Sequence, residues 1–281
     1  MSIMFVNNCP VCGLETKNNN IVSTKGKKKS KVEIVQCKNC QLFYHRKYFN
    51  IESGAEYYSR GSCNAEIVPR SLTDLKPKIK KRQITKKILF DDWSKFRTGA
   101  RCGSIIKDVR KGSKILDVGC RVGSGIIWLK ENKQCIVEGV EPDYIFAKVL
   151  EKRNIKVHKQ LFENVKFNKK NRYDIIILRT VIDHFYSPLQ NFRRMYKLLN
   201  PGGYIFLVNT LVPDGLIKSI NTKMEKDYIF QVTHFVYFNK TSLSYLLKLS
   251  GFNRNKIVDI SRKNVIKKVN CKRVEQLKIY K

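Results

Sequence analysis

Residues 115–125 read ILDVGCRVGSG, an apolar run that leads directly into a glycine-rich turn. In a parallel α/β sheet, the loop after the first strand lies at the ligand crevice, where glycine lets the backbone approach a ligand or take a positive φ. Asp117, Gly119 and Gly123 stand where this design requires them, but Arg121 occupies the place of a middle glycine. The stretch predicts a nucleotide-type ligand site with a variant loop.

The residues that follow alternate between short apolar runs and helix-compatible segments. This alternation is typical of a parallel sheet built from right-handed βαβ units, and it predicts the α/β class. The expected strands are KILDVG (114–119), IVEGVE (136–141), YDIIIL (173–178) and YIFLVN (204–209), and the expected helices are GIIWLKENK (125–133), DYIFAKVLEKRN (143–154) and LQNFRRMYKLLN (189–200).

A second ligand-binding signal stands at the end of the next expected strand. Glu141 follows Gly119 by 22 residues. At this distance an acidic side chain can accept hydrogen bonds from both hydroxyls of a ribose. The glycine loop, the acidic strand end and the order of elements together predict a working nucleotide site.

The N-terminal segment carries two Cys-x-x-Cys pairs separated by 24 residues, formed by Cys9, Cys12, Cys37 and Cys40. Four thiolates complete the tetrahedron that Zn²⁺ prefers and leave no open position, so the spacing predicts a structural zinc site. A redox pair is the alternative, but it expects a thioredoxin-like unit, which is absent from the sequence. Losing the metal is expected to unfold this small ribbon and not the larger sheet.

Composition limits the other classes of function. The 281 residues include 56 Lys and Arg against 23 Asp and Glu, a net charge of +33 that is spread over every segment and fits genomic bias or nucleic-acid binding. The start does not resemble a signal peptide and the apolar runs are too short to cross a bilayer, so a cytoplasmic protein without membrane insertion is expected. The five cysteines outside the pairs are interpreted as buried apolar residues.

Three segments are predicted: a zinc ribbon over 1–50, a helical connector or lid over 51–111, and a catalytic domain over 112–281. In the connector, apolar residues recur at near-helical spacing, and Tyr57 and Tyr58 are candidates to close a pocket. The spaced apolar residues are Ile84, Ile88, Trp93 and Phe96.

Two later stretches identify a family. Residues 173–210 contain an acidic-His pair, Asp183 and His184, and a Pro-Gly-Gly turn at 201–203, and residues 234–252 read HFVYFNKTSLSYLLKLSGF. With the glycine loop they resemble the class I S-adenosylmethionine-dependent methyltransferases, in the methyltransferase-23-like branch that often carries an N-terminal zinc ribbon and is similar to sugar and small-molecule methyltransferases.

The resemblance implies a Rossmann-like, doubly wound, seven-stranded sheet and S-adenosyl-L-methionine as cofactor. The implied cofactor-binding residues are Asp117, Gly119, Arg121, Gly123, Glu141 and Arg179. Three positions depart from the family pattern: Arg121, Asp183 in place of a more usual Glu, and QLFEN at 160–164, which lacks the acidic residue that often meets the adenine amine. Arg121 either keeps an ordinary backbone conformation or occupies a positive φ, at a cost of about 1 kcal/mol.

His184 is the first candidate for a catalytic base, because it follows the fourth strand on the crevice side and an imidazole can take a proton near neutral pH. A structural histidine in that loop is the alternative. His234 and Tyr237 are the further catalytic candidates.

Three functions remain open at this point. The first is methyl transfer to a small molecule, in particular a sugar or sugar nucleotide of a surface-polysaccharide or secondary-metabolite pathway. The second is an RNA methyltransferase whose ribbon contacts RNA, although ILRTVIDH stands where an Asn-Pro-Pro-Tyr motif would be expected. The third is a non-enzymatic zinc-ribbon scaffold with a decayed cofactor loop.

Overall fold

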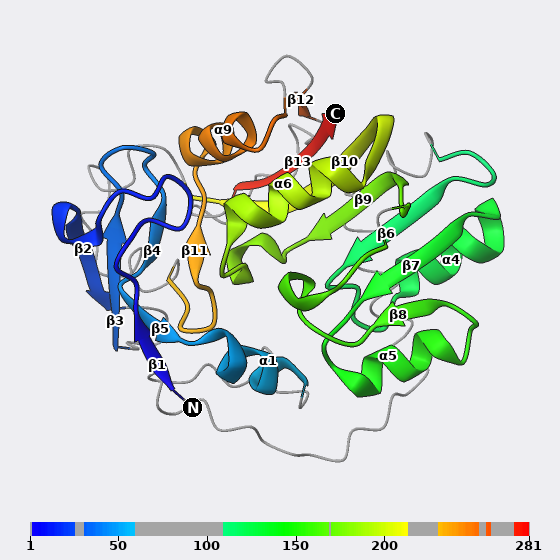
Figure 1. Ribbon diagram of the computed structural model, residues 1–281, viewed down its shortest axis with the longest axis horizontal. Helices are drawn as coiled ribbons and strands as arrows, with labels where there is room; N and C mark the ends of the chain where they lie inside the picture. Colours follow the sequence, from blue (N-terminus) through cyan, green and yellow to red (C-terminus); the bar gives the residue numbers. More distant parts are fainter. Residues whose placement is uncertain are drawn as a thin grey trace.

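A seven-stranded sheet forms the centre of the protein (Figure 1). The computed structural model describes residues 2–25, 31–59, 109–168, 170–212, 230–252, 257–259 and 273–280, and the apolar residues predicted for the connector helix lie outside these ranges. The strand order is β12-β13-β10-β9-β6-β7-β8. The strands are β6 (Lys114–Val118), β7 (Ile136–Val140), β8 (Lys156–His158), β9 (Tyr173–Arg179), β10 (Leu199–Leu211), β12 (Ile257–Asp259) and β13 (Arg273–Tyr280).

Five neighbouring strands, β8, β7, β6, β9 and β10, run parallel, while β13 pairs antiparallel with both β10 and β12. The order reverses beside β6, because the chain first adds β7 and β8 on one side and then β9 and β10 on the other. The doubly wound, seven-stranded sheet is therefore confirmed, and ligands of such sheets bind at the carboxyl ends of the strands near this reversal.

Alternate residues of each strand face opposite sides, so each face has its own apolar core. Leu116 and Ile176 belong to the core that also contains Phe192 of helix α6, and Ile115 and Ile175 belong to the core that also contains Ile126 of helix α4. The helices of this domain are α4 (Ser124–Lys133), α5 (Tyr144–Glu151), α6 (Pro188–Leu198) and α9 (Lys240–Leu249), with single turns η4 (Phe162–Asn164) and η5 (Ile182–His184).

Helix starts follow local chemistry. Asp143 caps α5 by accepting hydrogen bonds from the backbone N–H groups of Ile145 and Phe146. Asn239 and Ser242 form a reciprocal capping box at the start of α9. Pro188 occupies the first turn of α6, where its missing N–H costs nothing.

The N-terminal segment forms a second, four-stranded sheet in the order β11-β4-β3-β2. Residues 1–50 supply three of its strands, and β11 comes from the C-terminal half of the chain. The strand β11 of the small sheet leads into α9 (Figure 1). One apolar core contains residues of the small sheet, of α9 and of the large sheet. The elements here are β1 (Ile3–Phe5), η1 (Thr16–Asn18), β2 (Asn20–Lys25), β3 (Lys31–Gln36), β4 (Phe43–His45), β5 (Lys47–Phe49), α1 (Ile51–Ser59) and β11 (Val236–Tyr237).

Among the described residues, no helix combines the length and apolar character that a membrane span requires.

Candidate active site and cysteine cluster

The turn after β6 needs its two glycines. Gly119 has a φ of 70°, and a Cβ placed there would lie 2.9 Å from Cγ2 of Val181. Gly123, with a φ of 67°, is the N-cap of α4, and a Cβ there would collide with the side chain of Leu150. Both positions therefore exclude larger residues on conformational and steric grounds.

Arg121 also occupies the left-handed region, with a φ of 51°. Of the two interpretations of this residue, the positive φ is the one found, and it costs about 1 kcal/mol for a residue with a Cβ. Its backbone N–H donates to Oε2 of Glu141 at 2.7 Å, and its guanidinium lies 5.4 Å from the ring centroid of Phe146. These contacts favour the strained conformation.

Glu141 directly follows β7 and is buried. Its Oε1 accepts the backbone N–H of Asp143 at 2.9 Å, so two amides fix the carboxylate in place. Burial raises the pKa of Glu141 to about 7. Each carboxylate oxygen can accept more than one hydrogen bond, and so Glu141 retains acceptor capacity for ligand hydroxyls.

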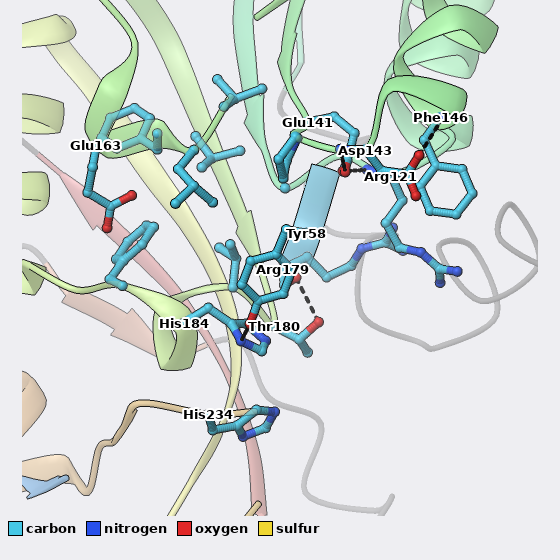
Figure 2. Close-up of a pocket in the computed structure, with 18 residues that line it drawn as sticks. Tyr58, Arg121, Glu141, Asp143, Phe146, Glu163, Arg179, Thr180, His184 and His234 are labelled. Atoms are coloured by element: carbon cyan, nitrogen blue, oxygen red, sulfur yellow. Dashed lines mark hydrogen bonds between the residues drawn. The ribbon is translucent and has the colours of Figure 1, made fainter. Parts of the chain in front are cut away.

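A cavity of about 430 Å³ opens at the carboxyl ends of β6, β7 and β9 (Figure 2). The turn residues Gly119 and Arg121 line one part of it together with Glu141. A second part is lined by Tyr58 of α1, His184 of η5 and His234 of the segment before β11. Arg179 and Thr180, at the end of β9, lie between them. The cavity thus joins four of the six predicted cofactor residues to two of the predicted catalytic residues.

His184 is held through Nδ1. This atom lies 2.9 Å from the carbonyl oxygen of Thr233 and 2.7 Å from the hydroxyl of Tyr58. Because a carbonyl oxygen only accepts, a hydrogen bond to Thr233 requires the proton on Nδ1, and the lone pair is then on Nε2. Burial lowers the pKa of His184 to about 4, which keeps the ring neutral near pH 7.

His234 stands next to His184. The two ring centroids are 4.8 Å apart and the rings are nearly perpendicular. Nδ1 of His234 lies 3.8 Å from Oδ2 of Asp183, whose other oxygen accepts a hydrogen bond from Nδ2 of Asn209 at 3.1 Å. Burial raises the pKa of Asp183 to about 7. Asp183, which replaces the more usual Glu, therefore still places an acidic group beside His184 and His234.

Three predicted site residues lie outside the described lining of the cavity. Asp117 is buried in β6, and Gly123 acts from the N-cap of α4. Tyr237 is buried in the small sheet, where its hydroxyl donates to the carbonyl oxygen of Gln231 and accepts from the N–H of the same residue, both at 2.7 Å. Its hydroxyl is therefore engaged outside the described lining of the cavity.

Glu163 is a lining residue that the sequence did not single out. The stretch 160–164 does bring this acidic residue to the cavity, and its Oε1 accepts from Nδ2 of Asn191 at 2.8 Å and from the N–H of Tyr186 at 3.1 Å. Burial raises the pKa of Glu163. Its position in the turn after β8 was the signal that could have identified it.

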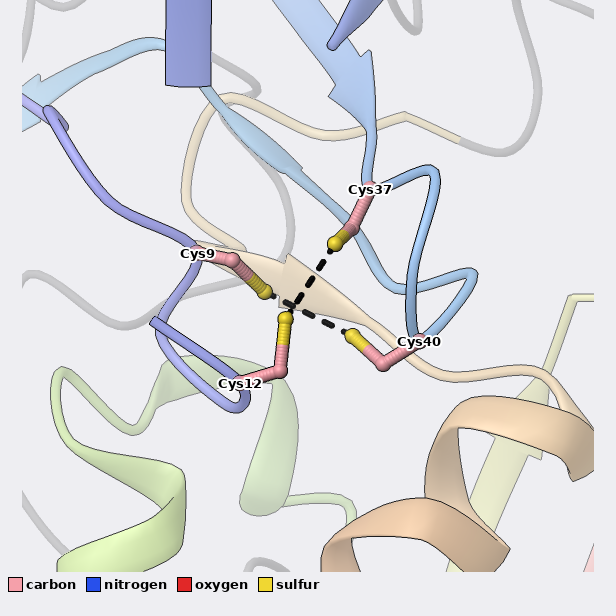
Figure 3. A group of neighbouring side chains, drawn as sticks. All are labelled: Cys9, Cys12, Cys37 and Cys40. Atoms are coloured by element: carbon pink, nitrogen blue, oxygen red, sulfur yellow. Dashed lines mark hydrogen bonds between the residues drawn. The ribbon is translucent and has the colours of Figure 1, made fainter. Parts of the chain in front are cut away.

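The four paired cysteines converge on one point (Figure 3). Sγ of Cys9 lies 3.5 Å from Sγ of Cys40, Sγ of Cys12 lies 3.4 Å from Sγ of Cys37, and all four sulfurs lie within 4.8 Å of one another. A tetrahedral Zn²⁺ with Zn–S bonds of about 2.3 Å places its sulfurs roughly 3.8 Å apart. The donor type and spacing therefore fit zinc.

The two cysteine turns have the same backbone design. The N–H of Gly13 donates to the carbonyl oxygen of Cys9 at 3.0 Å, and the N–H of Gln41 donates to that of Cys37 at 2.9 Å. Gly13 has a φ of 77° and Gln41 a φ of 62°. Gln41 thus adopts the left-handed conformation that Gly13 has in the first pair, and the turn keeps its backbone hydrogen bond although Gln41 is not a glycine.

Comparison with known proteins identifies the family. Residues 87–256, more than half of the chain, match the family model described as a methyltransferase domain. The chain belongs to this family. Together with the seven-stranded sheet, this membership identifies a methyltransferase domain with the class I type of fold.

Relatives of the methyltransferase share only parts of their length with it. Phosphoethanolamine N-methyltransferase 3 from Arabidopsis thaliana is 32% identical over 107 residues, which are 36% of this chain and 22% of the plant enzyme. A tRNA U34 carboxymethyltransferase from Pseudoalteromonas atlantica is 28% identical over 160 residues, 54% of this chain and 48% of that protein. The methyltransferase therefore spans less than half of these relatives.

Among solved structures, the YcgJ protein from Bacillus subtilis is similar with a TM-score of 0.51 at 14% identity. The likeness covers 64% of the methyltransferase and 97% of YcgJ. At this identity it supports the fold alone.

Proposed function

We propose that this methyltransferase methylates a small-molecule acceptor, in particular a hydroxyl or an acidic C–H of a sugar or sugar nucleotide. The observation that carries the proposal is the single cavity that joins the glycine turn and Glu141 to the neutral His184. A cavity of about 430 Å³ that also receives a cofactor leaves room for a small molecule or for one projecting group of a larger one.

The cofactor side of the cavity consists of Gly119, Arg121 and Glu141. S-adenosylmethionine, when bound, supplies an electrophilic methyl group on a sulfonium centre. Gly119 allows close approach of the backbone, and the Glu141 carboxylate accepts from ribose hydroxyls. Phe162 and Phe185 give the cavity part of its apolar wall.

On the acceptor side, Nε2 of His184 takes the proton that the nucleophile releases. In this role the Thr233 carbonyl accepts a hydrogen bond from Nδ1–H, which leaves the lone pair on Nε2. His234, next to Asp183, receives or orients the polar groups of the acceptor.

His184→Asn tests the role of the base, because asparagine keeps a hydrogen-bonding group but cannot take a proton at neutral pH. We expect turnover to fall by roughly 10²- to 10⁴-fold with little change in the affinity for S-adenosylhomocysteine. Release of S-adenosylhomocysteine is measured with a panel of sugars and nucleotide sugars. His158→Asn is the matched control, because His158 lies on β8 outside the described lining of the cavity. Full turnover in His184→Asn would reject this role and direct attention to His234.

An RNA substrate is the competing function, favoured by the net charge of +33 and by the similarity to a tRNA-modifying enzyme. Incubation with labelled S-adenosylmethionine and total RNA distinguishes the two functions. Label in RNA, with none in the sugar panel, would replace the small-molecule proposal. Absence of S-adenosylhomocysteine binding would favour a scaffold.

We also propose that Cys9, Cys12, Cys37 and Cys40 hold one structural Zn²⁺ per chain. Metal analysis of the purified protein should find zinc, and Cys37→Ser with Cys40→Ser should remove it, because serine is a poor ligand for this metal. Cys135→Ser is the control, since Cys135 is buried far from the pairs in sequence and lies outside the cluster. Zinc retained in the double variant would contradict the site.

A further inference from the structure

Three polar side-chain atoms lie within hydrogen-bond distance of the carbonyl oxygen of Thr233. Nδ1 of His184 lies 2.9 Å from it, the hydroxyl of Tyr58 lies 3.2 Å from it, and the hydroxyl of Tyr48 donates to it at 2.6 Å. The contact of Tyr48 is the shortest of the three, and this residue lies on β5, in the N-terminal part of the chain. Burial raises the pKa of Tyr48 well above its ordinary value, so that its hydroxyl keeps the proton it donates.

The segment that carries Thr233 is attached to the small sheet on both sides. Val236 and Tyr237 pair with β4, and the backbone N–H of His45 donates to the carbonyl oxygen of Phe235 at 3.1 Å. Nε2 of His45 lies 3.1 Å from the carbonyl oxygen of Gln231. The ring of Tyr48 also stacks on that of Phe235, with centroids 4.9 Å apart. The N-terminal sheet therefore sets where the Thr233 carbonyl points.

Within the described ranges, two acceptors lie within reach of the Tyr58 hydroxyl, and the one that it uses bears on the His184 tautomer. Its hydroxyl is 3.2 Å from the Thr233 carbonyl and 2.7 Å from Nδ1. When Nδ1 carries a proton, it donates to the carbonyl and Nε2 is the free base. When Tyr58 donates to Nδ1 instead, the proton moves to Nε2, and that nitrogen can no longer accept one.

We propose that Tyr48 is a positioning residue for His184: by holding the Thr233 carbonyl toward Nδ1, it keeps His184 in the tautomer whose Nε2 can accept a proton. The inference rests on the proposed role of His184 as the base. It assigns to the N-terminal segment a part in the chemistry of the cavity, through a residue of β5 that does not itself line it.

The test is NMR of the full chain with ¹⁵N-labelled histidine, which reports directly which ring nitrogen carries the proton. The chain has four histidines, and loss of one signal set in His184→Asn assigns His184. The wild-type protein should show a single Nδ1–H form. In Tyr48→Phe, a second form protonated at Nε2 should appear, and Tyr48→Phe with Tyr58→Phe should restore the single form, because the competing donor is gone.

Tyr44→Phe is the matched control. Tyr44, on β4, is likewise a buried tyrosine of the N-terminal segment, but its hydroxyl lies 2.9 Å from Oγ1 of Thr16 and 3.0 Å from Nδ2 of Asn19, away from Thr233. Its variant should keep the wild-type tautomer. Unchanged S-adenosylhomocysteine binding in each variant shows that the cofactor side is intact.

Two results would overturn the proposal: an Nε2–H form already dominant in the wild-type protein, or a Tyr48→Phe variant that keeps the single Nδ1–H form. The first applies even where Tyr48→Phe does not fold. Failure of the proposed function is read separately, from the turnover of His184→Asn. Lost turnover in that variant with an unchanged tautomer in Tyr48→Phe would reject the positioning role alone.

Discussion

At the scale of single residues, Glu141 combines burial with two backbone donors, and this makes its ligand binding sensitive to pH. Burial raises its pKa to about 7, so that below this pH the free site holds a neutral carboxylic acid, which is a weaker acceptor for ribose hydroxyls. The affinity for S-adenosylhomocysteine should therefore fall as the pH decreases through about 7 and level off above it. Calorimetric titrations between about pH 6 and 8 measure this step.

Glu141→Gln should flatten the step and weaken binding at high pH by about 1 to 3 kcal/mol, because one charged acceptor is lost. Glu138→Gln is the control, because Glu138 lies on β7, the strand that Glu141 follows. Although burial of Glu138 opposes it, hydrogen bonds from His158 and Tyr173 and the charge of Lys156 lower the pKa of this carboxyl to about 2. It does not titrate in this range, so its variant should keep the step. An equal step in Glu141→Gln would assign the titration to another group.

The backbone conformation of Arg121 could not be predicted from its residue type. The spacing of Gly119 and Glu141 identified both as lining residues, because chain geometry fixes where a turn and the next strand end must lie. The left-handed φ of Arg121 could not be deduced, since a residue with a Cβ disfavours it and only the contacts with Glu141 and Phe146 favour it.

At the scale of elements, the turn before α4 is constrained twice, by its φ and by the helix packed above it. Gly123→Ala should cost about 1 to 2 kcal/mol for the left-handed conformation. The clash with Leu150 of α5 should add about 1 to 3 kcal/mol, because the neighbouring helix must shift. Denaturant unfolding measures both contributions together.

The Gly112→Ala variant separates the conformational cost of a left-handed alanine from the cost of the steric clash. Gly112 has a φ of 80°, and a Cβ placed there would meet no atom within 4 Å. Its variant should therefore show the conformational cost alone, and the difference between the two variants gives the cost of the clash. Equal losses of stability would mean that α5 yields without cost.

Strands and helices of the large sheet were largely predictable, because their apolar periodicity is a local property of the sequence. The expected strands at 114–119, 136–141, 173–178 and 204–209 all overlap β6, β7, β9 and β10. The pairing of β11 with β4 was not predictable, because it joins residues about 190 positions apart that carry no shared motif. For the same reason Tyr237 was interpreted as a catalytic candidate, and Tyr48 and Thr233 were not singled out.

At the scale of the whole molecule, the cysteine cluster and the catalytic sheet share one apolar core. That core includes Phe43 of β4 and Tyr48 of β5 together with Phe235, Leu246 and Ile176 of the remainder of the chain. A sheet that shares its core with another does not unfold alone without exposing apolar surface of both. The structure therefore changes what we expect of metal removal: the ribbon should not melt independently.

Chelation of the metal should lower the temperature of a single cooperative transition. The ion binds the folded state, so its loss lowers the free energy of unfolding by the free energy of binding. Because the two sheets share a core, both are destabilised. Scanning calorimetry of the full chain, with and without chelator, measures it, and the Cys37→Ser and Cys40→Ser double variant should behave like the chelated protein. S-adenosylhomocysteine should raise the transition in both states, because Gly119 and Glu141 lie outside the small sheet. Two separate transitions, of which only the lower responds to chelator, would contradict this coupling and show that the cluster stabilises an independent unit.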